Sequence, residues 1–164
     1  MTKEELTVQS PEDIRLQKYR SSLIASGGAM VLFALWTVIR SIVEIDSNLN
    51  YVGDQVSIQP LVTAIAVMGI IDLVLKLYVG LSARLEGLSR KKKRPYLVLG
   101  IIIAALSIAW LIFMIVEFPT QYRLYGLVGP IINLAVEATV LFAALDLVIS
   151  AIRVRKLEKE IGRT

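Results

Sequence analysis

The most constraining feature of this sequence is a run of 21 residues, 96–116, that contains no charged side chain. Three further apolar runs with few charges occupy residues 23–39, 61–75 and 127–152. The hydrocarbon core of a bilayer is about 30 Å thick, so a helix that rises ~1.5 Å per residue crosses it in roughly 20 residues. Each run reaches this length once its flanking residues are included, and the sequence therefore predicts four transmembrane helices.

The continuity of these runs favours helices over strands. A membrane β-barrel alternates apolar and polar residues in segments of about ten, whereas these runs are apolar throughout. A hydrophobic content of 55% with a mean hydropathy of +0.66 is also too high for a soluble domain of this length. We therefore expect an all-α integral membrane four-helix bundle.

The polar stretches between the runs divide the chain into five segments. The predicted segments are a cytoplasmic or interfacial N-terminal helix at 1–21, a transmembrane hairpin at 22–83 with spans 22–45 and 60–81, a basic loop at 84–95, a second hairpin at 96–152 with spans 96–117 and 127–152, and a charged tail at 153–164. Ser10 is expected to cap the N-terminal helix and Pro11 to be its first residue, although a polar tail without regular structure is the alternative. Pro119 is expected to end the third span, because proline disrupts helical hydrogen bonding.

The distribution of basic residues predicts the orientation in the membrane. Fifteen of the 18 Lys and Arg residues lie in the N-terminal segment, the central loop and the C-terminal tail, and only Arg123 lies in a loop at the other end of the spans. By the positive-inside rule, both termini and the central loop are cytoplasmic, which predicts a multi-pass protein of the plasma (inner) membrane. The five consecutive basic residues from Arg90 to Arg94 are expected to contact anionic lipid headgroups, and no nucleic-acid partner is expected.

A shift of 73 or 74 residues aligns the two halves of the sequence. Trp36 then falls on Trp110, and Asp72 falls on Asp146. These matches predict two similar hairpins in a tandem parallel repeat, related by an axis along the membrane normal. Chance similarity between apolar helices, which share a small alphabet of residues, is the alternative.

The absence of cysteine and histidine excludes several kinds of chemistry. Disulfides, thiolate nucleophiles and iron–sulfur sites require cysteine, and the usual zinc sites and proton shuttles require histidine. The sequence also contains no phosphate-binding glycine loop and no nucleophile elbow. We therefore expect no catalytic residue, no metal and no cofactor, and no enzymatic activity.

Several ionisable residues are predicted to lie at membrane depth. A charge near the centre of a transmembrane helix costs about 2.5–3.5 kcal/mol on insertion scales, so it is expected to face the bundle interior and a partner. Glu137 lies roughly 15 Å into the fourth span at ~1.5 Å per residue, with Asn133 one turn away on the same face. Asp72 is similarly deep in the second span, with Lys76 one turn further along.

These depths predict a polar binding site inside the bundle. Its candidate residues are Glu137, Asn133, Arg40, Glu44, Glu117, Trp36, Trp110, Asp72 and Lys76. Carboxylates beside tryptophan rings are suited to a cation, and a buried carboxylate can exchange protons with a solute. The structural alternative is that Arg40 pairs with Glu137 or Glu117, and Asp72 with Lys76, only to fix the register of the helices.

Two functions remain open from the sequence. The first is a small transporter or ligand-binding membrane protein for a cation or a proton-coupled solute, with Glu137 as its central carboxylate. Four spans enclose little volume, so a homo-oligomer is expected. The alternative is a non-catalytic membrane scaffold or accessory subunit whose intramembrane charges meet those of another membrane protein.

Overall fold

The computed structural model describes residues 10–51, 59–88, 95–125 and 128–162. Its four helices are α1 (Pro11–Tyr51), α2 (Gln59–Gly87), α3 (Pro95–Tyr125) and α4 (Val128–Glu160). Each of the four is long and apolar enough to cross a membrane. The described residues therefore confirm the all-α class and the four apolar spans.

The N-terminal segment and the first span form one continuous helix. The Ser10 hydroxyl accepts a hydrogen bond from the Asp13 backbone N–H at 3.2 Å, so Ser10 caps the helix as predicted. Helix α1 then continues without a break to Tyr51. The prediction for Pro119 is wrong, because this residue lies inside α3, which continues to Tyr125. A proline removes a single backbone donor, and a helix can continue past that loss.

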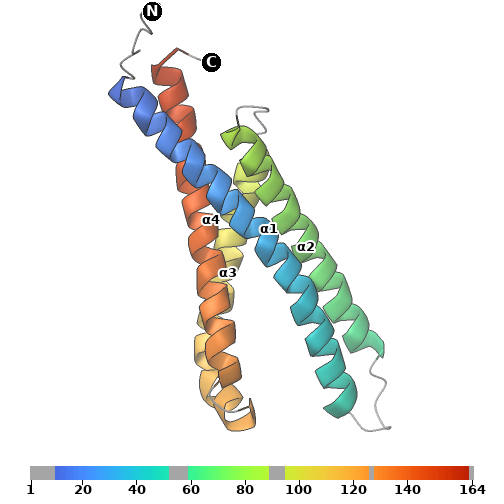
Figure 1. Ribbon diagram of the computed structural model, residues 1–164. Coiled ribbons are helices and arrows are strands. Elements are labelled where there is room, and N and C mark those ends of the chain that lie inside the picture. Colours follow the sequence, from blue (N-terminus) through green and yellow to red (C-terminus); the bar gives the residue numbers. More distant parts are fainter. Residues whose placement is uncertain (1–9, 52–58, 89–94, 126–127, 163–164) are drawn as a thin grey trace, which may run out of the picture.

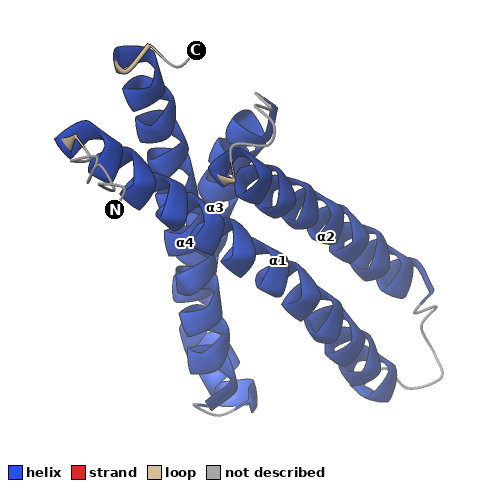
Figure 2. Cartoon of the chain, turned by 45° about the horizontal axis from the view of Figure 1, so that its top comes forward, coloured by secondary structure: helices blue, strands red, loops and turns tan. Residues whose placement is uncertain are grey.

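The helices pack in two pairs that cross each other (Figure 1). Helix α1 packs along α2, α3 packs along α4, and α1 also packs against α4, whereas α2 and α3 make little contact. Both termini lie at one end of the bundle, which we call the terminal end (Figures 1 and 2). At the opposite end the α1–α2 pair and the α3–α4 pair diverge.

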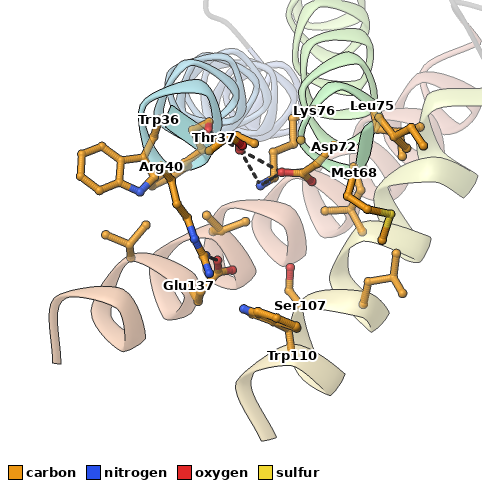
Figure 3. A pocket seen from close by; sticks show the side chains of 18 of the residues that line it. Trp36, Thr37, Arg40, Met68, Asp72, Leu75, Lys76, Ser107, Trp110 and Glu137 are labelled. Carbon is orange, nitrogen blue, oxygen red and sulfur yellow. Dashed lines mark hydrogen bonds and ion pairs between the residues drawn. The ribbon is translucent and has the colours of Figure 1, made fainter. Parts of the chain in front are cut away.

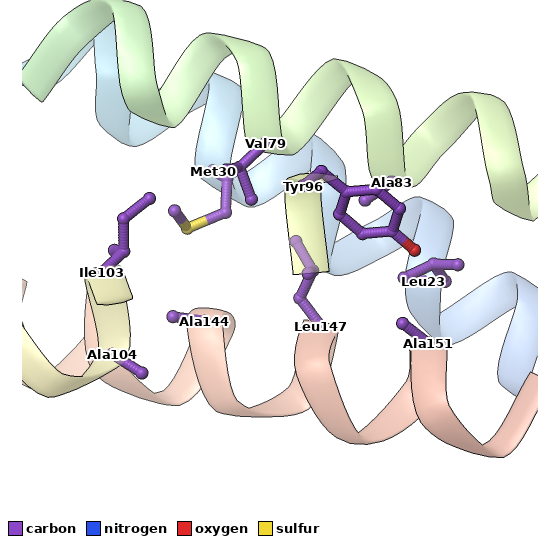
Figure 4. Close-up of a cluster of buried hydrophobic side chains, with 10 residues drawn as sticks. All are labelled: Leu23, Met30, Val79, Ala83, Tyr96, Ile103, Ala104, Ala144, Leu147 and Ala151. Atoms are coloured by element: carbon purple, nitrogen blue, oxygen red, sulfur yellow. The ribbon is translucent and has the colours of Figure 1, made fainter. Parts of the chain in front are cut away.

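Close backbone packing and a shared core hold the terminal half together. A Cβ added to Gly27 would lie 2.7 Å from the carbonyl oxygen of Gly80, so the backbones of α1 and α2 touch there. All four helices contribute to one buried apolar cluster (Figure 4). Its members are Leu23, Met30, Val79, Ala83, Tyr96, Ile103, Ala104, Ala144, Leu147 and Ala151. They lie on the halves of the helices nearer the terminal end.

The packing does not confirm the predicted repeat. An axis that exchanged the two pairs would make the α1–α4 interface equivalent to the α2–α3 interface, and the first of these is far more extensive. The matched residues Asp72 and Asp146 also both bind hydroxyls of α1, which are those of Thr37 and of Ser22 and Ser26. The repeat therefore remains a prediction, as does the side of the membrane on which the termini lie.

Candidate functional site

A cavity of about 780 Å³ lies between the two helix pairs (Figure 3). Its lining comes from all four helices, on the parts that adjoin the apolar cluster and extend away from the terminal end. Most of the lining side chains are apolar, and four are the aromatic residues Phe33, Trp36, Trp110 and Phe113. The polar members are Thr37, Arg40, Ser41, Asp72, Lys76, Ser107 and Glu137.

An ion pair in this cavity joins the two helix pairs. The Arg40 guanidinium on α1 donates to the Glu137 carboxylate on α4 at 2.7 Å. The two side chains are 26% and 14% exposed, so solvent or ligand can still reach them. The guanidinium carbon also lies 5.9 Å from the ring centroid of Trp110 on α3, a distance within the range of cation–π attraction. Three helices therefore meet at Arg40.

A second ion pair lies within the α1–α2 pair. Lys76 donates to Asp72 at 2.6 Å, one turn away on α2. The Thr37 hydroxyl of α1 lies 2.9 Å from the same carboxylate oxygen and 3.3 Å from the Lys76 ammonium. Lys76 is buried, which is possible for a charged ammonium because both neighbours are hydrogen-bond partners.

The charges on the cavity lining balance. Arg40 and Lys76 supply two positive charges, and Asp72 and Glu137 supply two negative charges. Each carboxylate is bonded to one of the two cations. As seen in the described part of the chain, the cavity is therefore a neutral site that contains four full charges.

Six of the nine predicted site residues line this cavity. They are Trp36, Arg40, Asp72, Lys76, Trp110 and Glu137. Asn133 is exposed and lies one turn beyond Glu137, on the part of α4 that diverges from α1. Glu117 is partly buried two turns beyond Trp110, outside the cavity lining. The side chain of Glu44 lies outside the described residues.

The sequence prediction missed Thr37, Ser41 and Ser107 in the lining. Helical spacing was the signal that could have found two of them, because residues three apart lie on one face of a helix. Thr37 precedes Arg40 by three residues, and Ser107 precedes Trp110 by three. A search for small hydroxyl residues at that spacing from the predicted charges and rings would have included both.

A separate set of polar contacts joins the helices near the terminal end. Arg155 of α4 binds the Glu86 carboxylate of α2 through two nitrogens, at 2.8 and 2.9 Å. Arg20 of α1 donates to Glu158 of α4 at 2.7 Å, and both glutamates are buried. Asp146 accepts hydrogen bonds from Ser22, at 2.7 Å, and from Ser26. These contacts connect the two helix pairs on the side of the apolar cluster that faces away from the cavity.

Four long apolar helices with charged groups paired between them indicate a multi-pass membrane protein. No protein-family model, no curated protein and no solved structure matches the chain. The functional argument therefore depends on the cavity and its contacts.

Proposed function

We propose that the protein is a small transporter or ligand-binding membrane protein that binds a cation or a proton-coupled solute in the cavity between the helix pairs. The observation that carries this proposal is the Arg40–Glu137 pair, 2.7 Å long, in the lining of a cavity of about 780 Å³. Glu137 is the binding carboxylate, and Arg40 is its resident counter-ion.

The size and lining of the cavity support a ligand site. Small-molecule sites typically enclose about 300–1,000 Å³, with apolar and aromatic surfaces and a few polar groups that fix the ligand's orientation. This cavity falls in that range, and its polar groups gather around two ion pairs. Close packing of the helices would have left no such space, since protein interiors are as dense as organic crystals.

The position of the Arg40 guanidinium supports a ligand with a cationic group. The guanidinium is bonded to the Glu137 carboxylate and lies close to the Trp110 ring. A carboxylate and an indole face are the two features that bind an organic cation. Arg40 therefore occupies the place that a ligand cation would take, and binding would exchange one cation for the other.

The two ends of the bundle differ in a way that supports access from one side. Near the terminal end the helices are joined by the apolar cluster and by the Arg20–Glu158 and Glu86–Arg155 pairs. At the other end the helix pairs diverge. If the termini are cytoplasmic, as the basic residues predict, the cavity is reached from the outer side. Transport would then require the two pairs to rock, so that the terminal end opens.

The accessory-subunit alternative makes a different demand on the same charges. It requires intramembrane charges that meet the helices of another protein. In this chain Arg40 pairs with Glu137, and Asp72 with Lys76, within one molecule. This internal pairing favours the cavity as the functional feature.

The proposal is tested by Glu137→Gln in proteoliposomes, with Glu117→Gln as the matched control. The same substitution is made in both cases, but Glu117 lies outside the cavity lining. Tetraethylammonium uptake and the collapse of an imposed pH gradient would be measured for protein that elutes as a single species. We expect Glu137→Gln to abolish both activities and Glu117→Gln to retain them. Unchanged fluxes, together with lost capture of a partner membrane protein, would support the accessory role instead.

A further inference from the structure

We infer that the ligand is a zwitterion with an apolar body, whose ammonium binds Glu137 and whose carboxylate binds Arg40. This inference depends on the proposed function, because it names the class of ligand for the same cavity. It follows from the balance of charge in the lining, from the helices that carry the two residues, and from the aromatic side chains around them.

The balance of charge argues against an ion of a single sign. The described lining contains two basic and two acidic side chains, each carboxylate bonded to a cation at 2.6 or 2.7 Å. A bound cation would leave the site with one excess positive charge, and a bound anion with one excess negative charge. An uncompensated charge is unfavourable at membrane depth, where water does not solvate it. A zwitterion adds no net charge, so it avoids this penalty.

The placement of the ion pairs shows which of them a ligand can enter. Asp72 and Lys76 are one turn apart on α2 and share contacts with Thr37, so they stay together in any arrangement of the helices. Arg40 and Glu137 lie on α1 and α4, which belong to different helix pairs. A small separation of the pairs therefore parts Arg40 from Glu137 and leaves both side chains in the cavity.

A zwitterion inserted between the two side chains replaces one ion pair with two. The planar guanidinium of Arg40 matches the geometry of a carboxylate, which it can bind through two parallel hydrogen bonds. The Glu137 carboxylate accepts hydrogen bonds from the ligand's ammonium. In an α-amino acid these two groups share one carbon, so they fit a gap opened between two side chains that are now in direct contact.

The aromatic residues indicate the rest of the ligand. Trp110 lies beside Arg40, and its ring centroid is 5.4 Å from that of Phe113 (Figure 3). Trp36 lies one turn from Arg40 on α1 and also lines the cavity. A site with charged groups at one point and rings around it favours an apolar or aromatic α-amino acid, or a compound of the same form.

Three compounds with the same body test the inference. L-phenylalanine is a zwitterion, its methyl ester is a cation and N-acetylphenylalanine is an anion. Binding to the purified full chain in nanodiscs would be measured by isothermal titration calorimetry. We expect phenylalanine to bind at least tenfold more tightly than either analogue. If the ester binds as tightly as phenylalanine, or none of the three binds while tetraethylammonium does, the inference is overturned and the proposed cation site stands. If neither these compounds nor tetraethylammonium binds, both proposals fail.

Single substitutions should change the preferred charge in opposite directions. Glu137→Gln leaves Arg40 in the site, so the preference should move toward N-acetylphenylalanine by at least tenfold. Arg40→Gln leaves Glu137, so the preference should move toward the methyl ester by a similar factor. A pair that only fixes helix register would give no such reciprocal change, and its absence in folded variants overturns the inference.

A charge exchange keeps the test valid if either single variant fails to fold. The double variant Arg40→Glu with Glu137→Arg retains one charge of each sign between α1 and α4. It should again prefer phenylalanine to both analogues, while Glu117→Gln should keep the parent order of affinities. A folded double variant that prefers the ester would contradict the inference.

Discussion

The two halves of the bundle are built from the same four helices but pack in different ways. In the terminal half, small residues such as Gly27, Gly80 and Ala104 allow the helices to approach closely around a shared core. In the cavity half, large rings such as Trp36 and Trp110 occupy the facing positions, and the helix pairs diverge. The comparison teaches that side-chain size along each helix, more than overall hydrophobicity, decides where the bundle closes.

The ion pairs of the two halves differ in the same way. The Glu86 carboxylate in the terminal half is 3% exposed and is held by two nitrogens of Arg155. The Glu137 carboxylate in the cavity half is 14% exposed and is held by one nitrogen of Arg40. We interpret the first as a structural pair and the second as a pair that a ligand can open.

The largest effect on stability is expected at Arg155. Arg155→Met leaves the Glu86 carboxylate buried without its cation, which should lower the free energy of unfolding by about 3–5 kcal/mol. Lys156→Met is the control, because Lys156 is 78% exposed and its contact with Glu160 is 4.0 Å long. It should cost less than about 1 kcal/mol. Unfolding in a titration with denaturing detergent measures both, and equal costs would contradict the structural role of the Glu86–Arg155 pair.

A smaller effect is expected where α1 and α2 touch. Gly27→Leu places a side chain against the backbone of Gly80, and such overpacking should cost about 1–3 kcal/mol. Gly28→Leu tests the same change at a neighbouring position, where an added Cβ would meet nothing within 4 Å. The same titration should show little loss for Gly28→Leu. If both variants lose stability equally, helix propensity rather than close packing would explain the result.

Much of the fold and part of the site could be predicted from local patterns. Apolar runs of sufficient length specify the four spans, and the spacing of Asp72 and Lys76 specifies an ion pair within one helix. The Arg40–Glu137 pair was one of two pairings that membrane depth allowed. Depth along a helix can be counted from the sequence, so it restricts which charges can meet.

The remaining features depend on how the helices are arranged. Glu86 and Arg155 lie on different helices, and no local spacing relates them. Asn133 shares a helix face with Glu137, but the divergence of α4 from α1 keeps it out of the cavity lining. The unequal α1–α4 and α2–α3 interfaces likewise depend on tertiary packing, which the apparent repeat does not determine.

The reactivity of two introduced cysteines tests the central claim, that one half of the bundle is open and the other is closed. The chain has no cysteine, so Ser107→Cys in the cavity and Ser150→Cys in the terminal half each provide a unique thiol. The two serines have similarly low exposure, 8% and 2%. In nanodiscs, where both faces of the bilayer are accessible, a charged methanethiosulfonate reagent should modify the thiol at 107 at least tenfold faster than the thiol at 150. Equal rates, or faster reaction at position 150, would contradict the account.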